Sequence, residues 1–146
     1  MPALNTPTLS GRLVELRPAE HAGPLSPRSV ASWWTWRLED MKLVGHAGLR
    51  YESGGTYSVG FYFLRRARAE GGYGAEVLRL VCRFAVERFA ATKLVCTPPD
   101  LGRKAAAEEA GFRLASSSPP QHSKRRRGIG RWTLEWEPKP PIRSHA

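Results

Sequence analysis

The sequence predicts a mixed α+β domain built on a central, largely antiparallel sheet of six or seven strands with two main helices. Its 146 residues, 41% of them hydrophobic, are enough for one buried core but not for two. The first half alternates polar and apolar residues, whereas two later segments repeat apolar residues at helical spacing. We therefore expect a single domain over residues 1–146, with loose Pro-rich ends at 1–10 and 138–146.

The first half of the chain predicts an antiparallel meander. The expected strands are at residues 12–17, 33–39, 42–51 and 57–64. Asp40 and Met41 would form one hairpin turn, and residues 52–55 would form the next. Residues 18–32 contain three prolines and leave room for at most one short turn of helix.

The second half predicts a helix, a strand, a second helix and a final pair of strands. The expected helices are at residues 74–90 and 101–110, and the expected strands are at 93–97, 112–115 and 131–137. Gly111 follows the second helix at the position where a left-handed residue commonly ends a helix.

Basic residues dominate the charge of the chain. There are 23 Lys and Arg against 13 Asp and Glu, which gives a net charge of +10. A basic cluster in the last third consists of Lys124, Arg125, Arg126, Arg127 and Arg131. Such a cluster could attract RNA or a ribosome through its phosphates, or it could be a solvated loop. Only Trp132 lies near it as an aromatic that could stack on a base.

Several classes of protein are disfavoured by the sequence. No apolar run reaches the roughly 18 residues of a membrane span, and the N-terminus lacks the layout of a secretion signal, so we expect a cytoplasmic protein with no membrane partner. Cys82 and Cys96 lie in apolar stretches without metal-ligand spacing. We expect two buried, reduced thiols and no metal site.

A glycine-rich segment at residues 65–76 joins a predicted strand to the first long helix. Its glycines allow a ligand to approach the backbone, and the helix start offers unpaired N–H groups to an anion. Nearby arginines could add charge for a phosphate. A plain strand-to-helix turn with solvated arginines explains the same residues. The segment matches neither a Walker loop nor a strict GxGxxG motif.

Four pieces of the chain together resemble the GCN5-related N-acetyltransferases. They are residues 43–49, 59–63, 72–78 and 110–112, in the order and spacing of that family. The nearest branch acetylates ribosomal-protein N-termini, antibiotics and small amines. The resemblance implies that acetyl-CoA is the co-substrate and that an amine attacks its thioester directly. It also implies a gap between two splayed strands that holds the pantetheine arm.

The resemblance assigns candidate contacts with acetyl-CoA. They are Phe61, Tyr62, Phe63, Leu64, Arg66, Arg68, Gly71, Gly72, Tyr73, Gly74, Ala75, Asp100 and Arg103. If Gly72 and Gly74 match the glycines of the family, Arg68 lies one place earlier than the family pattern; if Arg68 and Gly71 match instead, Tyr73 stands where the family has a small residue. Residues 101–111 contain no Tyr to protonate the leaving thiolate. We interpret Tyr62 and Tyr73 as packing or loop residues.

No familiar catalytic base is present. The position that is often acidic in the family is Ser58 here, and the candidates are Glu52, His46 and Ser58 itself. Glu52 and Glu70 could equally be solvated turn residues, and His46 could be a satisfied strand histidine. A catalytically weak module that binds CoA or a partner is therefore the alternative to an active enzyme.

The family usually places two helices between its first two strands, and residues 18–32 replace them here. We expect this truncation to leave the acceptor cleft open, or closed by a partner chain or by loop 116–130. Five tryptophans would serve as core and sheet-face residues, some of them exposed, which would favour a homodimer.

Overall fold

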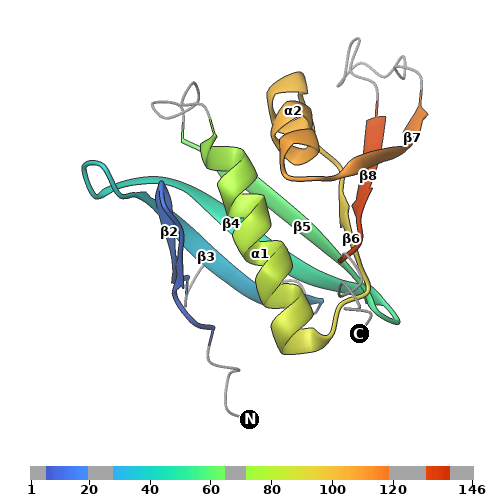
Figure 1. Cartoon of the computed structure of the whole chain (residues 1–146), viewed down its shortest axis with the longest axis horizontal. Coiled ribbons are helices and arrows are strands. Elements are labelled where there is room, and N and C mark those ends of the chain that lie inside the picture. Colours follow the sequence, from blue (N-terminus) through green and yellow to red (C-terminus); the bar gives the residue numbers. More distant parts are fainter. Residues whose placement is uncertain (1–5, 20–27, 65–71, 119–130, 139–146) are drawn as a thin grey trace, which may run out of the picture.

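The computed structural model describes residues 6–19, 28–64, 72–118 and 131–138. It contains an eight-stranded sheet in the order β1-β2-β3-β4-β5-β6-β8-β7, in which β5 and β6 are parallel and every other neighbouring pair is antiparallel. Figure 1 shows α1 lying across the meander, with α2 beside β7 and β8. The predicted order of meander, helix, strand, helix and strand pair is confirmed.

The bounds of the elements follow the periodicity of the sequence closely. They are β1 (Leu9–Ser10), β2 (Val14–Pro18), β3 (Ser29–Arg37), β4 (Lys42–Ser53), β5 (Thr56–Phe63), α1 (Tyr73–Phe89), β6 (Lys93–Cys96), α2 (Leu101–Glu109), β7 (Arg113–Ser118) and β8 (Arg131–Trp136). Met41 takes a positive φ of 56° in the β3–β4 hairpin turn, and Gly111 takes 104° just after α2.

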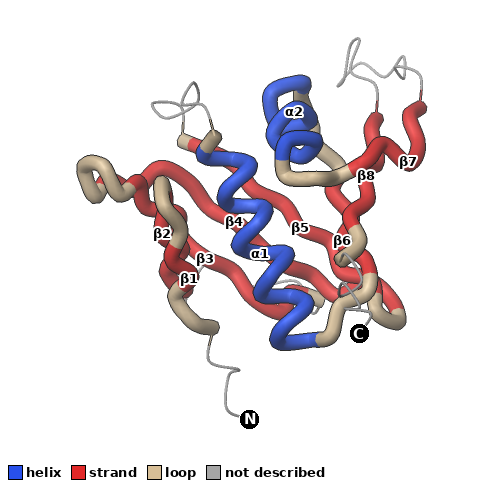
Figure 2. Tube along the Cα trace, in the orientation of Figure 1, coloured by secondary structure: helices blue, strands red, loops and turns tan. Residues whose placement is uncertain are grey.

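The structure corrects three predictions. The sheet has eight strands rather than six or seven, because Leu9–Ser10 adds a short edge strand opposite Leu16 and Glu15 (Figure 2). The N-terminal end is therefore not loose over those two residues. Residues 29–32 belong to β3 and not to a helical turn, since Ala31 and Ser32 pair with Leu49 and Gly48 of β4.

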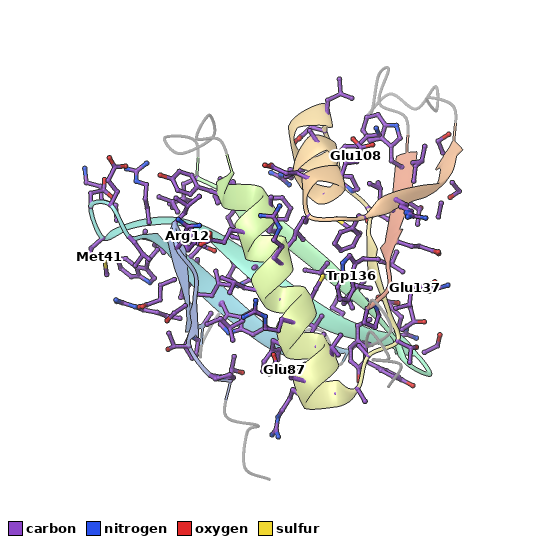
Figure 3. The ribbon with its side chains drawn as sticks, viewed as in Figure 1. Arg12, Met41, Glu87, Glu108, Trp136 and Glu137 are labelled. Atoms are coloured by element: carbon purple, nitrogen blue, oxygen red, sulfur yellow. The ribbon has the colours of Figure 1, made fainter. Side chains whose placement is uncertain are left out.

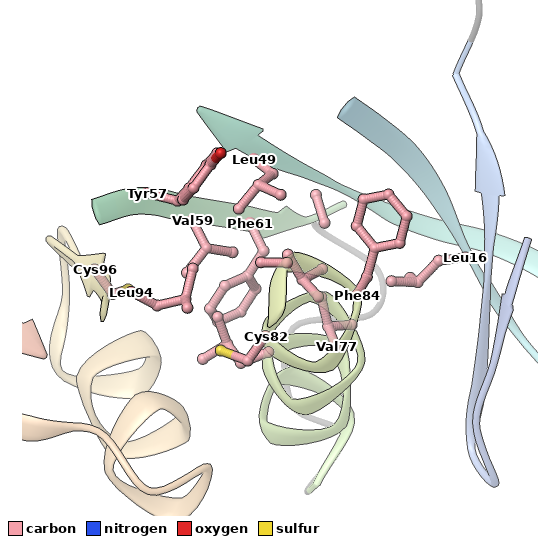
Figure 4. Packing of buried hydrophobic residues seen from close by; sticks show 14 of the residues in the cluster. Leu16, Leu49, Tyr57, Val59, Phe61, Val77, Cys82, Phe84, Leu94 and Cys96 are labelled. Atoms are coloured by element: carbon pink, nitrogen blue, oxygen red, sulfur yellow. The ribbon is translucent and has the colours of Figure 1, made fainter. Parts of the chain in front are cut away.

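The core lies between α1 and one face of the sheet, which we call the helix-covered face. Leu49 and Phe61 point to this face from adjacent strands, and Val77 and Phe84 meet them from α1 (Figure 4). Trp33 is fully buried and meets the ring of Phe84 edge-on at 5.2 Å. Strand residues alternate between faces, so every second residue of β3, β4 and β5 is directed to the opposite, open face.

The open face carries a row of aromatic side chains on neighbouring strands. Trp34, His46 and Tyr62 are direct cross-strand partners of β3, β4 and β5. The ring of His46 lies 5.0 Å from that of Trp34 and 5.6 Å from that of Tyr62. Tyr62 is 40% exposed, and in the described part of the chain no helix packs over this row.

Candidate active site

The parallel strands β5 and β6 separate after a short contact. They pair only between Thr56–Ser58 and Lys93–Val95, after which β5 continues to Phe63 and β6 stops at Cys96, two residues before Pro98. Within the described residues, the backbone of residues 59–63 therefore has no strand partner on the β6 side. This splay lies where the family resemblance predicts the gap for the pantetheine arm.

The start of α1 lies beside that gap. Gly72 precedes the helix with a φ of 86°, and among the described residues no side chain caps the first-turn N–H groups. A Cβ on Gly74 would lie 2.9 Å from Ala106 of α2 and 3.1 Å from Phe61 of β5, so this glycine brings three elements together. A helix N-terminus beside a strand gap is suited to an anion such as a pyrophosphate, because the backbone N–H groups and the positive end of the helix dipole are directed at it.

A cavity of about 510 Å³ opens from the gap onto the open face of the sheet. Gly48 and Gly60 face each other across β4 and β5 and form its floor. A Cβ on Gly60 would meet no atom within 4 Å, and one on Gly48 would meet only the carbonyl oxygen of Ala31, at 3.9 Å. The missing side chains hollow the sheet surface at this point. The walls come from β3, β5, β6 and α2.

Ser58 and Glu52 form a pair at one end of the cavity. The Ser58 hydroxyl donates a hydrogen bond of 2.6 Å to Oε2 of Glu52, while Nη1 of Arg28 lies 3.6 Å from Oε1. Glu52 lies in β4 rather than in a solvated turn, so the turn interpretation of this residue is wrong. Ser58 lines the cavity and thus brings the Glu52 carboxylate within one hydrogen bond of it.

His46 also lines the cavity, but its environment limits its chemistry. Burial lowers the pKa of His46 below its ordinary value of 6.5, which keeps the imidazole neutral at physiological pH. Its Nε2 atom is buried and has no hydrogen-bond partner among the described residues. That nitrogen therefore does not face the cavity, and His46 serves better as a wall between Trp34 and Tyr62 than as a base.

At the other end of the cavity, Arg103 projects from the first turn of α2. Its Nε lies 3.6 Å from Oδ2 of Asp100, and its backbone N–H donates a 2.8 Å hydrogen bond to Oδ1 of the same residue. Asp100 is thus the N-cap of α2, a role that explains its presence without a ligand. Arg103 is held beside the strand gap as a result.

The structure brings only part of the predicted set together. The cavity is lined by His46, Ser58, Phe61, Tyr62 and Arg103, whereas Gly72, Tyr73, Gly74 and Ala75 form the helix start nearby. Phe63 is the last residue of β5 and Leu64 follows it. Tyr73 is buried in the core, as the packing interpretation predicts. Arg66, Arg68, Glu70, Gly71 and the cluster Lys124–Arg127 lie outside the described residues, and of Arg131 only the backbone, in β8, is described.

Sequence reasoning missed two features of the cavity, Arg50 and the glycine floor. Gly48 and Arg50 are two residues apart on β4, and Ser58 and Gly60 are two residues apart on β5, so each pair lies on one face of its strand. This equal spacing is a signal from which the pairing of Arg50 with Ser58 and of Gly48 with Gly60 could have been predicted. In the part of the chain that the structure describes, no group of three or more His, Cys, Asp or Glu residues could hold a metal ion. None of the described helices is long and apolar enough to cross a membrane.

Comparison with known proteins places this architecture in one fold class. No family model matches the sequence, and a search of curated proteins found no match. Solved structures do match, and among them are an acetyltransferase of the GCN5-related (GNAT) family and ribosomal-protein acetyltransferases. The chain therefore has the fold of the GCN5-related N-acetyltransferases.

Individual neighbours cover most of the molecule. A GNAT-family acetyltransferase from Bacillus anthracis matches with a TM-score of 0.69 and 12% identity, over 89% of this chain and 98% of that one. The ribosomal-protein-S5-alanine acetyltransferase of Vibrio fischeri matches with a TM-score of 0.69 and 7% identity, over 90% and 97%. RimJ of Mycobacterium smegmatis in complex with CoA-disulfide matches with a TM-score of 0.61 and 13% identity, over 75% and 53%.

Proposed function

We propose that this protein is an N-acetyltransferase that transfers the acetyl group of acetyl-CoA to a primary amine. The observation that carries the proposal is the splay of β5 from β6 beside the start of α1. The free edge of residues 59–63 offers backbone groups to an extended amide-bearing chain such as pantetheine. The amides at the start of α1 would take the pyrophosphate.

The reaction needs a neutral amine, and the Ser58–Glu52 pair offers a route for its proton. The acceptor ammonium would give a proton to Oγ of Ser58 as the Ser58 hydroxyl proton passes to Oε2 of Glu52, 2.6 Å away. The amine nitrogen then attacks the thioester carbonyl carbon, the C–N bond forms, and the C–S bond breaks. The proton that the nitrogen still has to lose passes to the departing sulfur, so that the products are the amide and CoA thiol. Arg103 at the gap would stabilise the negative charge that develops on the sulfur before it takes this proton.

Binding of the co-substrate is the first test. Calorimetric titration with acetyl-CoA, with free CoA as a second ligand, should show micromolar binding to both because the phosphates and pantetheine are common to them. Absence of binding to either ligand would overturn the proposed function. Binding without CoA release above background across a panel of amines and N-terminal peptides would favour the alternative, a module that binds CoA without turnover.

The proton route has its own test. Glu52→Gln should lower kcat by about a hundredfold, since a positioned acid or base contributes roughly 10²–10⁴ in rate. Ser58→Ala should cause a similar loss, and acetyl-CoA affinity should not change in either variant. Glu137→Gln, an exposed carboxylate next to β8, is the matched control (Figure 3). An unchanged kcat in Glu52→Gln would remove this residue from the reaction.

The basic cluster at residues 124–127 and the homodimer stay predictions from the sequence. RNA association through the cluster would fall steeply with salt, because phosphate binding releases counterions. An Arg125→Ala, Arg126→Ala, Arg127→Ala triple variant with unchanged RNA affinity would exclude it.

A further inference from the structure

The described walls of the cavity carry positive charge without matching negative charge. Two guanidinium groups, those of Arg50 and Arg103, line it, and no Asp or Glu is among the described lining residues. The two carboxylates nearby are each balanced by an arginine: Nη1 of Arg28 lies 3.6 Å from Oε1 of Glu52, and Nε of Arg103 lies 3.6 Å from Oδ2 of Asp100. A ligand in this cavity therefore meets a net positive surface.

Arg50 differs from Arg103 in its partners. Arg103 lies 3.6 Å from the Asp100 carboxylate, at the strand gap where the thioester would be. Arg50 is exposed on β4, and within the described part of the chain no carboxylate pairs with it. Guanidinium groups bind carboxylate and phosphate groups with two parallel hydrogen bonds, so an exposed and unpaired Arg at a cavity rim is a suitable anion contact.

The strand register places Arg50 beside Ser58, the residue that would take the proton of the acceptor amine. Arg50 is the direct cross-strand partner of Ser58, and Gly48 and Gly60 are the next pair on the same face. Residues two apart on one strand are separated by about 6.6 Å. A molecule over the glycine floor could therefore place its amine near Ser58 and the thioester while an anionic group a few bonds away reaches Arg50.

We infer that the acceptor is a small primary amine that carries an anionic group, as amino acids do, and that Arg50 binds this group. The inference rests on the proposed function, because it names the substrate class of the same site. A polyamine would place a second ammonium group against Arg50 and Arg103, where like charges repel. Arg50 is thus a specificity residue and takes no part in proton transfer.

Three amines of similar length test the substrate class. They are γ-aminobutyrate, butylamine and putrescine, which differ in having a carboxylate, a methyl or an ammonium group at the far end. The value of kcat/KM should fall in that order. Arg50→Gln should lower kcat/KM for γ-aminobutyrate by about ten- to a hundredfold, the usual range for a lost charged hydrogen bond, and should leave butylamine unaffected.

Arg113→Gln is the matched control, since Arg113 is an exposed arginine on β7 that does not line the cavity. This variant should keep the wild-type order of the three amines. Putrescine turned over as well as γ-aminobutyrate, or an Arg50→Gln variant with an unchanged preference, would overturn the inference.

A binding measurement separates this inference from the proposed function. The backbone amide signals of Gly48 and Gly60 in nuclear magnetic resonance should shift on addition of γ-aminobutyrate but not of putrescine, and Arg50→Gln should abolish the shift. This readout requires no acetyl-CoA and no turnover. If acetyl-CoA fails to bind, the proposed function is wrong. The titrations with γ-aminobutyrate and putrescine still decide whether the cavity selects an anionic group. Shifts with putrescine alone would show that it does not.

Discussion

One carboxylate oxygen of Glu76 accepts a 2.7 Å hydrogen bond from the backbone N–H of Leu13 and a second, of 2.9 Å, from Val14. Glu76 is in the first turn of α1, and Leu13 and Val14 lie at the start of β2. The pair ties the helix that would bind phosphate to the far side of the meander. The negative charge also suits the positive end of the helix dipole.

Replacing Glu76 with Ala should lower the free energy of unfolding by about 1–2 kcal/mol, because two backbone N–H groups lose their acceptor. Urea denaturation measures this change. Glu87→Ala is the matched control on the same helix, where the side chain is exposed and near the C-terminal end (Figure 3). Equal stability of the two variants would show that the Glu76 contacts contribute nothing.

Gly11 makes this contact possible, since a Cβ at that position would overlap Oε1 of Glu76. Gly11→Ala should therefore destabilise the wild-type protein by displacing the carboxylate. The same substitution should cost less in the Glu76→Ala background, where the overlap is gone. A double-mutant cycle by urea denaturation measures the coupling, which we expect to be about 1 kcal/mol. Additive effects would contradict a direct contact.

Gly74 and Gly102 should respond oppositely to the same substitution. Ala is favoured over Gly in a helix by about 1 kcal/mol, and Gly102→Ala should gain part of this, since its Cβ would make only an ordinary 3.4 Å contact. Gly74→Ala should instead destabilise the protein, because its Cβ would lie 2.9 Å from that of Ala106. Thermal denaturation of both variants measures the difference. A higher Tm for Gly74→Ala would show that α1 and α2 adjust freely.

The pKa of His46 gives stability a pH dependence with a defined sign. Burial lowers this pKa below 6.5, so between 6.5 and the lowered value the unfolded chain binds more protons than the folded one. The free energy of unfolding should therefore fall as pH drops below about 6.5. His46→Phe should show a smaller fall. An imidazole titration by nuclear magnetic resonance with a midpoint at or above 6.5 would contradict this assignment.

Cys82 and Cys96 are free and buried, as predicted from the sequence, and they should resist alkylation in the native protein. Burial raises the pKa of the Cys96 thiol to about 11 and raises that of Cys82 well above its usual range, so little of the reactive thiolate is present at neutral pH. Labelling with iodoacetamide should be slow in buffer and fast in urea. Rapid modification of the folded protein would contradict the burial.

Local pattern alone was enough to predict most of the elements. The apolar spacing from Val77 to Phe89 defines α1 to within a residue at each end, and Gly111 stops α2 where it was expected to. Strand β1 was missed because two residues are too short for any alternation to appear. Its position depends on pairing with Leu16 and Glu15, and only the folded chain provides that pairing.

The candidate site was less predictable. The sequence predicts a turn at Glu52 because Gly54 and Gly55 follow it closely. A register shift between Tyr51 and Ser53 accompanies the extension of β4 to Ser53, and there the Glu52 side chain meets Ser58. Arg50 could not be predicted for a related reason, since a single arginine has no motif around it. Its importance comes from Ser58, which lies opposite it on β5.

The sequence by itself determined the order of the elements, the two helices, the buried thiols and the family whose fold the chain shares. Each of these depends on spacing along one segment or on motifs in a fixed order, and both are visible in one dimension. The tertiary structure decided which polar groups meet: Ser58 with Glu52, Gly48 with Gly60, and Glu76 with the start of β2. Such contacts depend on strand register and on helix docking, which arise only when the whole core packs.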